Sequence, residues 1–423
     1  MPASRALQII ANHARRKTFA PGDTLEVTPD LVALDASGAQ DMIDAWRRAK
    51  GGRARGARRF LFVADPQQPA AQRRSVQAFG NEQRVALNLD PARMGWPGAV
   101  ALEGGQVGAG DLIVGGTPDL GAVGGIGALA LRARPEELVH LLKHKGLEVA
   151  APPSFGVAIN GRLPRWVGPQ DVALYLAHEL GASARGVVLE LTGTAITGLP
   201  VGDRLVLCEA LARAGLVALV PDDEAVRVWL AARRTSPPAE EAEQPKGPKA
   251  GSTGGPPSRP SEHLHDGSPE LAPVEHQFKA ERLGLLAQID GKLVKPTGTD
   301  DRPVDEVVVA GSLHELRQAA TALQERRIQP GLRFYVLPAT RRTLLHALEE
   351  GLVTAFVRSG GILLTPGGTP PPTGRGDRRV TTRAADPRDV LTGPAVAAAT
   401  AICGRLIDPE TMRRENRRTA PLQ

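Results

Sequence analysis

The sequence predicts an α/β protein in which parallel or mixed sheets are covered by helices on both faces. Three observations lead to this fold class. Short apolar runs, typical of buried strands, alternate with helical segments along most of the 423 residues. Hydrophobic residues make up 42% of the chain and charged residues 23%, which is ordinary for a globular protein. One Pro- and Gly-rich stretch, residues 235–276, interrupts the alternation.

The N-terminal part opens with a predicted helix that has a basic end, over residues 1–17. Continuous apolar runs without helical periodicity then predict buried strands. These runs are 59–64 (RFLFVA), 111–115 (DLIVG) and 186–191 (GVVLEL). The second run is followed by glycines and by an Ala/Leu-rich segment that we expect to be helical. Further helices are predicted over 135–145 and 203–214.

The interrupting stretch, residues 235–276, holds nine prolines and five glycines and no aromatic residue. Such a composition cannot bury enough apolar surface to offset the entropy lost on ordering. We therefore predict a disordered linker here. It divides the chain into an N-terminal region, 1–234, and a C-terminal region, 277–423.

The C-terminal region repeats the alternation of strands and helices. Its predicted strands are 304–310 (VDEVVVA), 332–337 (LRFYVL) and the short 362–364. Its predicted helices are 313–326, 341–350 and the Ala-rich 392–406. Alternation of this kind favours parallel strands joined by helical crossovers.

Composition excludes several classes of protein. Two cysteines, Cys208 and Cys403, rule out a disulfide framework and any site that takes three thiolates from this chain. The net charge of +6 is spread along the sequence and aromatic residues make up only 3%, so nucleic acid is not an expected partner. No apolar run approaches the roughly 20 residues of a membrane span, and no apolar signal core precedes the first strand. We expect a cytoplasmic protein without a membrane partner.

Two local patterns invite a functional interpretation. His140 and His144 are four residues apart on a predicted helix, a spacing that can hold a transition metal. No third ligand accompanies them, which favours a solvated helix face. Residues 115–127 (GGTPDLGAVGGIG) are rich in glycine after a strand, but their order does not match a dinucleotide-binding GxGxxG motif.

Three longer stretches resemble a known family. They are residues 9–30 (IIANHARRKTFAPGDTLEVTPD), 152–181 (PPSFGVAINGRLPRWVGPQDVALYLAHELG) and 393–409 (GPAVAAATAICGRLIDP). Together they resemble the large subunit of 3-isopropylmalate dehydratase, in the aconitase superfamily, over nearly the whole chain outside the predicted linker. The resemblance implies an aconitase-like three-layer α/β/α fold and a hydro-lyase that acts on hydroxy-di- or tricarboxylic acids through a [4Fe-4S] cluster. It also implies a separate small subunit that carries the swivelling domain, which this chain lacks.

The cluster ligands that the resemblance implies are missing. Family members use one cysteine in a Gly-Ser-Cys-Thr-Asn motif and two in a Gly-Cys-x-x-Cys motif. The corresponding positions are Leu313 (or a gap), Gly368 and Pro371, none of which can ligate iron. We therefore expect no cofactor.

The acid–base motifs of the family are also altered. Its Asp-Ser-His motif corresponds to residues 117–119, its His-Asp pair to 34–35 and its Asp-His-x-x-Pro motif to 65–69. Asp35, Asp65 and Asp119 are the acids that remain, and they are the candidate catalytic residues. The alternative for Asp35 and Asp65 is that each lies at a strand end and accepts backbone hydrogen bonds. Arg383 or Arg388 is the candidate remnant of the family's anion-binding loop.

Three functions follow from these departures, in order of preference. The first is a catalytically inactive, cluster-free homologue that serves as a scaffold or regulatory subunit and docks a swivel-domain small subunit. The second is a cluster-independent hydro-lyase or isomerase that acts on a small carboxylic acid with the retained aspartates. The third is an RNA-binding protein, by analogy with cluster-free aconitases.

Overall fold

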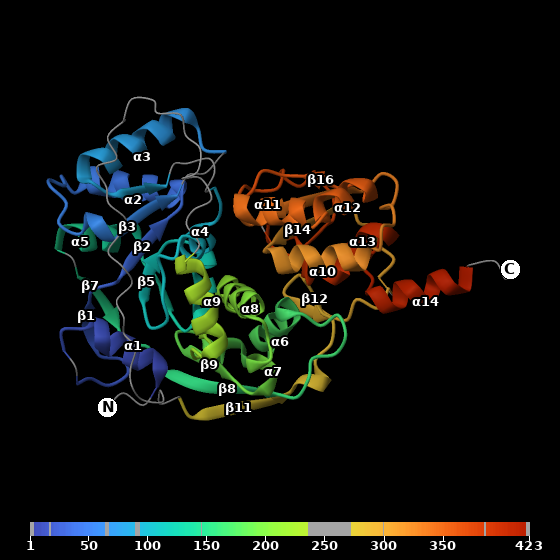
Figure 1. The fold of residues 1–423 in the computed structure, drawn as a ribbon, viewed down its shortest axis with the longest axis horizontal. Helices are drawn as coiled ribbons and strands as arrows, with labels where there is room; N and C mark the ends of the chain where they lie inside the picture. Colours follow the sequence, from blue (N-terminus) through green and yellow to red (C-terminus); the bar gives the residue numbers. More distant parts are fainter. Residues whose placement is uncertain are drawn as a thin grey trace. The chain divides into compact units, whose positions relative to one another are not determined.

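The computed structural model describes residues 4–16, 18–63, 67–88, 94–144, 146–235, 272–298, 300–384 and 386–419. The chain forms two compact units (Figure 1). Unit 1 contains residues 1–160 and 182–278, and unit 2 contains residues 161–181 and 279–423. Most of the predicted linker, 236–271, lies outside the described residues.

Unit 1 is built on a five-stranded parallel sheet of order β4-β3-β2-β5-β6 (Figure 1). Its strands are β2 (Leu31–Leu34), β3 (Phe60–Val63), β4 (Ala86–Asn88), β5 (Leu112–Gly115) and β6 (Leu129–Arg132). All four residues of β2, β3 and β5 are buried. Strands that are apolar on both faces must be covered on both faces.

The two faces of this sheet bury alternate residues in two separate cores. Phe60 and Phe62 point into a core with α2 (Ala36–Arg48), α3 (Ala70–Gln83) and α5 (Pro135–His144). Leu61 and Val63 point into a second core. That second core is closed by α4 (Pro97–Glu103), the 3-10 helix η3 (Pro118–Ile126) and residues of α8 (Val201–Arg213) and α9 (Glu224–Thr235). Unit 1 is therefore a three-layer α/β/α structure.

Unit 1 also holds two smaller sheets. One has the order β10-β9-β8-β11, with β8 (Ser154–Asn160), β9 (Val188–Thr192), β10 (Val217–Leu219) and β11 (Val274–Lys279). The other pairs β1 (Thr24–Val27) antiparallel with β7 (Leu147–Ala150). The remaining helices are α1 (Arg5–His13), η1 (Ala57–Arg59), η4 (Gly181–Ala184) and α7 (Thr194–Thr197).

Glycines let η3 approach α8 and β10 closely. Gly124 accepts a hydrogen bond from the backbone N–H of Val220 at 2.8 Å, and a Cβ on Gly124 would overlap the carbonyl oxygen of Ala218. We expect Gly124→Ala to lower the free energy of unfolding by about 1–3 kcal/mol, because backbone atoms rather than a flexible side chain would have to move. Urea titration followed by circular dichroism measures this change.

Gly116→Ala is the matched control for Gly124→Ala. A Cβ on Gly116 meets no atom within 4 Å, so this variant is expected to unfold at nearly the wild-type urea concentration. Equal stability of the two variants would contradict the close packing of η3.

Unit 2 is built on a seven-stranded mixed sheet of order β13-β12-β18-β17-β14-β15-β16. The run β18-β17-β14-β15-β16 is parallel, and β12 pairs antiparallel with β13 and β18. The strands are β12 (Ala287–Ile289), β13 (Lys292–Val294), β14 (Glu306–Gly311), β15 (Arg333–Pro338), β16 (Ile362–Leu363), β17 (Arg379–Thr381) and β18 (Val390–Thr392).

Helices cover the sheet of unit 2. Phe334 and Val309 share a core with residues of α10 (Leu313–Leu323), α12 (Leu352–Ser359) and α13 (Pro394–Cys403). The other helices of this unit are α6 (Pro169–Leu180), η5 (Ala280–Arg282), α11 (Arg341–Glu349) and α14 (Pro409–Thr419). The C-terminal α14 is drawn in red in Figure 1.

A buried ion cluster joins the amino ends of three strands in unit 2. Glu306 is in register with Arg379 on one neighbouring strand and with Arg333 on the other. Arg379 Nε donates to Glu306 Oε2 at 2.8 Å, and Arg333 Nε donates to Glu306 Oε1 at 2.9 Å. The side chains of Arg379 and Glu306 are only 2% and 4% exposed. A buried carboxylate with two arginines therefore fixes the register of the central strands.

The predicted α/β/α fold is confirmed, and most predicted elements lie within a few residues of the observed ones. Two expectations were wrong in detail. The Ala/Leu-rich segment that follows the glycines after β5 is not a helix but the strand β6, which pairs in parallel with β5, and the glycines themselves lie in the 3-10 helix η3. Helix 1–17 is shorter than predicted: α1 covers Arg5–His13, and the chain leaves the helix at Ala14, whose backbone is extended.

The compact units differ from the predicted division at 234 and 277. Residues 274–276 of the predicted linker belong to β11, in the sheet of β8. Residues 161–181 join unit 2. The carboxylate of Asp171 on α6 explains this assignment, because it accepts the backbone N–H of Leu286 at 3.0 Å, beside β12.

Candidate functional site

The carboxyl edge of the parallel sheet in unit 1 carries two of the predicted site residues. Ligands of α/β proteins bind at this edge of the sheet. Asp35 follows β2 directly, and Asp119 lies four residues after the end of β5. Asp65, the third predicted acid, lies outside the described residues.

Asp35 is the N-cap residue of α2. Its Oδ1 accepts the backbone N–H of Gly38 at 2.8 Å, and its backbone is extended, as an N-cap requires. This contact matches the structural alternative for Asp35, a carboxylate that accepts backbone donors at a strand end. A catalytic role for Asp35 remains a prediction.

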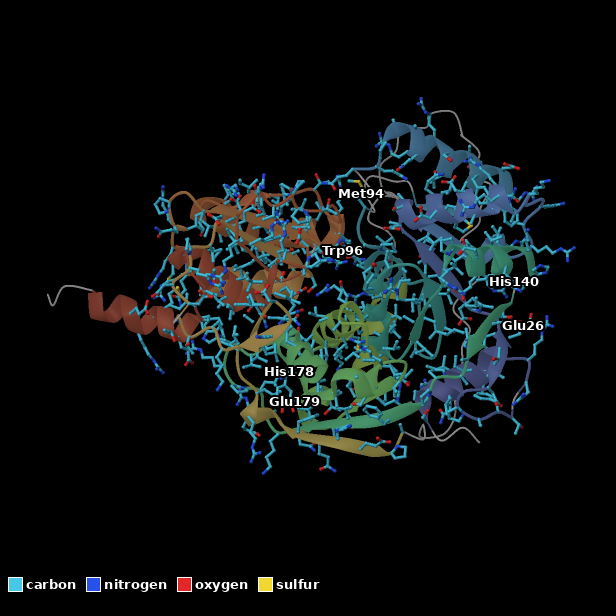
Figure 2. The ribbon with its side chains drawn as sticks, turned by 180° about the vertical axis from the view of Figure 1, so that it is seen from behind. Glu26, Met94, Trp96, His140, His178 and Glu179 are labelled. Atoms are coloured by element: carbon cyan, nitrogen blue, oxygen red, sulfur yellow. The ribbon has the colours of Figure 1, made fainter. Side chains whose placement is uncertain are left out.

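Asp119 is buried, with 3% of its surface exposed. Its Oδ2 accepts the backbone N–H of Gly98, the second residue of α4, at 2.8 Å. Trp96, the N-cap residue of α4, makes no side-chain capping bond, so Asp119 supplies that cap from another part of the chain (Trp96 is labelled in Figure 2). A carboxylate at a helix N-terminus is favoured by the helix dipole. Asp119 therefore stabilises the start of α4, and this structural role does not depend on any role in catalysis.

A small cavity of about 110 Å³ lies beside the same sheet edge. Its walls are mainly apolar and come from η3, β6, β10 and the residues that precede β10. Thr117 Oγ1 is buried at this cavity and has no hydrogen-bond partner among the described residues. Arg132 lines it too, and its Nη2 donates to the carbonyl of Gly116 at 3.2 Å. A hydroxyl and a guanidinium over apolar walls suit a small carboxylate with a short aliphatic part.

Sequence reasoning missed a buried histidine that is paired with an aspartate. His13 Nε2 lies 2.6 Å from Asp30 Oδ2, and its Nδ1 lies 2.7 Å from the carbonyl of Ile9. Burial alone lowers the pKa of His13, but the hydrogen bond and charge of Asp30 outweigh burial, so the pKa is raised. Asp30 precedes β2 and therefore lies at the amino edge of the sheet, away from the candidate site. Nothing in the residue spacing distinguishes this pair from a surface pair.

The other predicted histidine pair lies on the surface. His140 and His144 of α5 are exposed, with ring centroids 4.5 Å apart (His140 is labelled in Figure 2). In the part of the chain that the structure describes, no three histidine, cysteine or acidic side chains are grouped so that they could hold a metal ion.

The three positions that correspond to the family's cluster ligands lie at the start of a helix and in a loop of unit 2. Ser312 caps α10 and forms a capping box with Glu315, in which the N–H of Ser312 donates to Glu315 Oε2 at 2.8 Å. Leu313 is thus the first residue of that helix. Gly368 donates its N–H to the carbonyl of Thr365 at 3.1 Å, and the carbonyl of Pro371 accepts from the guanidinium of Arg379.

The two candidate anion-binding arginines have local partners. Arg388 donates to Asp386 through Nε at 2.9 Å and through Nη2 at 2.7 Å, and these bonds lower the pKa of Asp386. Arg383 follows β17, where its backbone N–H donates to Thr381 Oγ1 at 3.0 Å. The structure leaves their role in binding an anion as a prediction.

Comparison with known proteins decides the family. The model of the aconitase family (aconitate hydratase) matches residues 28–250, more than half of the chain. The chain belongs to the aconitase family.

Curated relatives of this aconitase-family chain match it over nearly its whole length. A 3-isopropylmalate dehydratase large subunit from Moorella thermoacetica is 27% identical over 430 residues, which cover 95% of this chain and 97% of the relative. A protein of the same name from Syntrophus aciditrophicus is 25% identical over 96% of this chain and 98% of its own length. A 3-isopropylmalate dehydratase large subunit 2 from Archaeoglobus fulgidus is 27% identical, over 96% and 98%. The resemblance seen in the sequence is confirmed.

The thiols of this aconitase-family chain do not fit a [4Fe-4S] cluster. Cys208 lies on α8 in unit 1, and burial raises the pKa of its thiol to about 12. Cys403 ends α13 in unit 2, and burial raises its pKa as well. Clusters are held by several thiolates, and the sequence contains only these two cysteines. No chemical step through a cluster follows from these residues.

Among the described residues of this aconitase-family chain, no helix is both long and apolar enough to span a membrane.

Proposed function

We propose that this chain is a catalytically inactive, cluster-free homologue of the isopropylmalate dehydratase large subunit. It acts as a scaffold or regulatory subunit. One observation carries the proposal: the chain has two cysteines, both on helices and both with raised thiol pKa values, while the positions of the family's ligands are Leu313, Gly368 and Pro371.

The remaining acids support the same proposal. Asp35 and Asp119 each accept a backbone N–H at the start of a helix, so each has a structural reason to be present without catalysis. The apolar cores that build the fold are complete on both faces of the sheet in unit 1. Packing is therefore retained while the polar chemistry of the family is not.

The expected partner is a small subunit with a swivelling domain. The curated relatives are named large subunits, and they match this chain over nearly their full length. A chain that retains the large-subunit fold retains the scaffold on which a small subunit docks. We expect such a protein to act in the cytoplasm.

A second candidate is a cluster-independent hydro-lyase or isomerase on a small carboxylic acid. The cavity lined by Thr117 and Arg132 favours this candidate, because it offers a hydroxyl and a cation at the carboxyl edge of the sheet. Binding without turnover would also use this cavity. No observation favours the RNA-binding alternative.

Iron analysis of protein purified without oxygen tests the first proposal. We expect neither iron nor acid-labile sulfide in stoichiometric amount, and no dehydration of isopropylmalate or citrate. The large subunit from Moorella thermoacetica, purified in the same way, is the positive control for the iron and sulfide analysis. A brown preparation with about four irons per chain would overturn the proposal.

Activity without iron separates the two candidates. Hydration or isomerisation of a small acid by the iron-free protein would support the second candidate. Loss of that activity in Arg132→Ala would place it at the cavity beside Thr117.

A further inference from the structure

Exposed apolar side chains gather on one part of unit 2. Seven large hydrophobic residues are exposed in the part of the chain that the structure describes, and five of them belong to α11, α12 and β16. These three elements follow one another in the chain, α12 packs against both of the others, and they lie together in Figure 1. The five residues, called here the α11–β16 patch, are Leu345, Leu348, Val357, Ile362 and Leu363. Apolar patches of this kind mark interaction surfaces more often than single exposed residues do.

One face of α11 carries both apolar and charged residues. Leu345 and Leu348 are 47% and 50% exposed. Residues three, four, seven and eight apart lie on the same face of a helix. The exposed face therefore has arginines at its amino end, leucines in the middle and a glutamate at its carboxyl end: Arg341, Arg342, Leu345, Leu348 and Glu349.

These charges oppose the dipole of their own helix. Cations are unfavourable at a helix N-terminus and anions at a C-terminus. Arg341 and Arg342 form the first turn of α11, and Glu349 ends it. In the described part of the chain, none of the three forms a hydrogen bond or ion pair that would compensate this arrangement. Opposite charges supplied by another molecule would compensate this unfavourable arrangement.

We propose that the α11–β16 patch binds the same patch of a second copy, with the two α11 helices antiparallel across a two-fold axis. A two-fold interface requires a surface that is complementary to itself. Antiparallel packing centred on Leu345 places Arg341 of one copy beside Glu349 of the other, and the same contact recurs on the opposite side of the axis. Each helix then receives an anion near its amino end and a cation near its carboxyl end.

The neighbouring elements supply the additional area that a dimer needs. Stable interfaces bury roughly 1,200–2,000 Å² in total, which exceeds what two leucines on one helix provide. Val357 on α12 and Ile362 and Leu363 on β16 extend the apolar surface. β16 is also the edge strand of its sheet, and a subunit seated on this patch covers that edge.

The mass of the full chain in solution tests the proposal. Sedimentation equilibrium of the wild-type chain is expected to give twice the 44.6 kDa of one copy. Leu345→Asp places a charge at the centre of the interface, and we expect it to give a single copy. Val228→Asp is the matched control, because Val228 is 61% exposed and lies on α9, outside the patch. Circular dichroism spectra equal to wild type show that the variants are folded.

Charge reversal tests the antiparallel arrangement. Arg341→Glu and Glu349→Arg are each expected to weaken the dimer at least tenfold, because each creates like-charge contacts twice across the axis. The double variant restores both pairs and is expected to recover dimerisation. A wild-type chain that is monomeric at 50 µM, a dimer unaffected by Leu345→Asp, or a double variant weaker than either single variant would overturn the proposal.

Discussion

Glu306→Gln is expected to lower the free energy of unfolding by about 3–5 kcal/mol, because it leaves a buried arginine without its counter-ion. Arg379 is 2% exposed, and its Nε and Nη2 both donate to Glu306 Oε2, at 2.8 and 2.6 Å. Glutamine keeps the shape and volume of the side chain but removes the negative charge. The measured quantity is the midpoint and slope of urea unfolding, from which the free energy is obtained.

Glu224→Gln is the matched control for the Glu306 variant. Glu224 forms an exposed ion pair with Arg227 on the surface of α9, and the side chains are 77% and 56% exposed. Exposed pairs contribute at most about 1 kcal/mol. If both variants lost the same small amount of stability, the buried cluster would not be holding the three strands.

The sequence was sufficient to predict the layers of the fold. Val307 and Val308 on β14 point to opposite faces of the sheet and are both buried, as expected for an apolar run in a parallel sheet. One short apolar strand escaped prediction. Leu31–Leu34 of β2 is fully buried, yet four residues are too few to distinguish a strand from a helix by periodicity.

Long-range contacts explain the differences in domain boundaries. Asp171 joins α6 to Leu286, residues that are 115 positions apart in the chain. Local patterns carry no information about such a contact, so residues 161–181 could not be assigned to unit 2 from the sequence.

The candidate site was predictable only in part. Strand ends place Asp35 and Asp119 at one edge of the sheet, as expected from parallel topology. The hydrogen bond between Asp35 and Gly38 is local, so a strand-end aspartate could be expected to form it. The hydrogen bond between Asp119 and Gly98 joins residues 21 positions apart and could not be predicted from local patterns. The buried Oγ1 of Thr117 depends on the packing of η3, which no motif indicated.

Asp171 is expected to make the chain less stable as the pH rises from about 4 to about 7. Its carboxyl group is buried, and burial raises its pKa to about 7, although Gly168 and Leu286 each donate a backbone N–H to it. Between the ordinary pKa of a carboxyl, about 4, and this raised value, the folded chain binds more protons than the unfolded chain. Stability therefore falls with rising pH across this window, by an amount on the order of a few kcal/mol.

Asp171→Asn removes this titration and is expected to flatten the dependence of the free energy of unfolding on pH between 5 and 8. At low pH, where the carboxyl of Asp171 is protonated, the variant is less stable than wild type by about 1–3 kcal/mol, because an amide presents an N–H₂ to one of the two backbone donors. This deficit shrinks as the pH rises, since only the wild type loses stability across the window. A residual slope of the same sign remains, since the pKa values of buried His13 and Glu190 are also raised. Asp386→Asn is the control: the pKa of Asp386 is lowered, so it titrates below this window and its removal leaves the slope unchanged. Parallel curves for wild type and Asp171→Asn would mean that Asp171 is ionised throughout, with its two backbone hydrogen bonds outweighing burial.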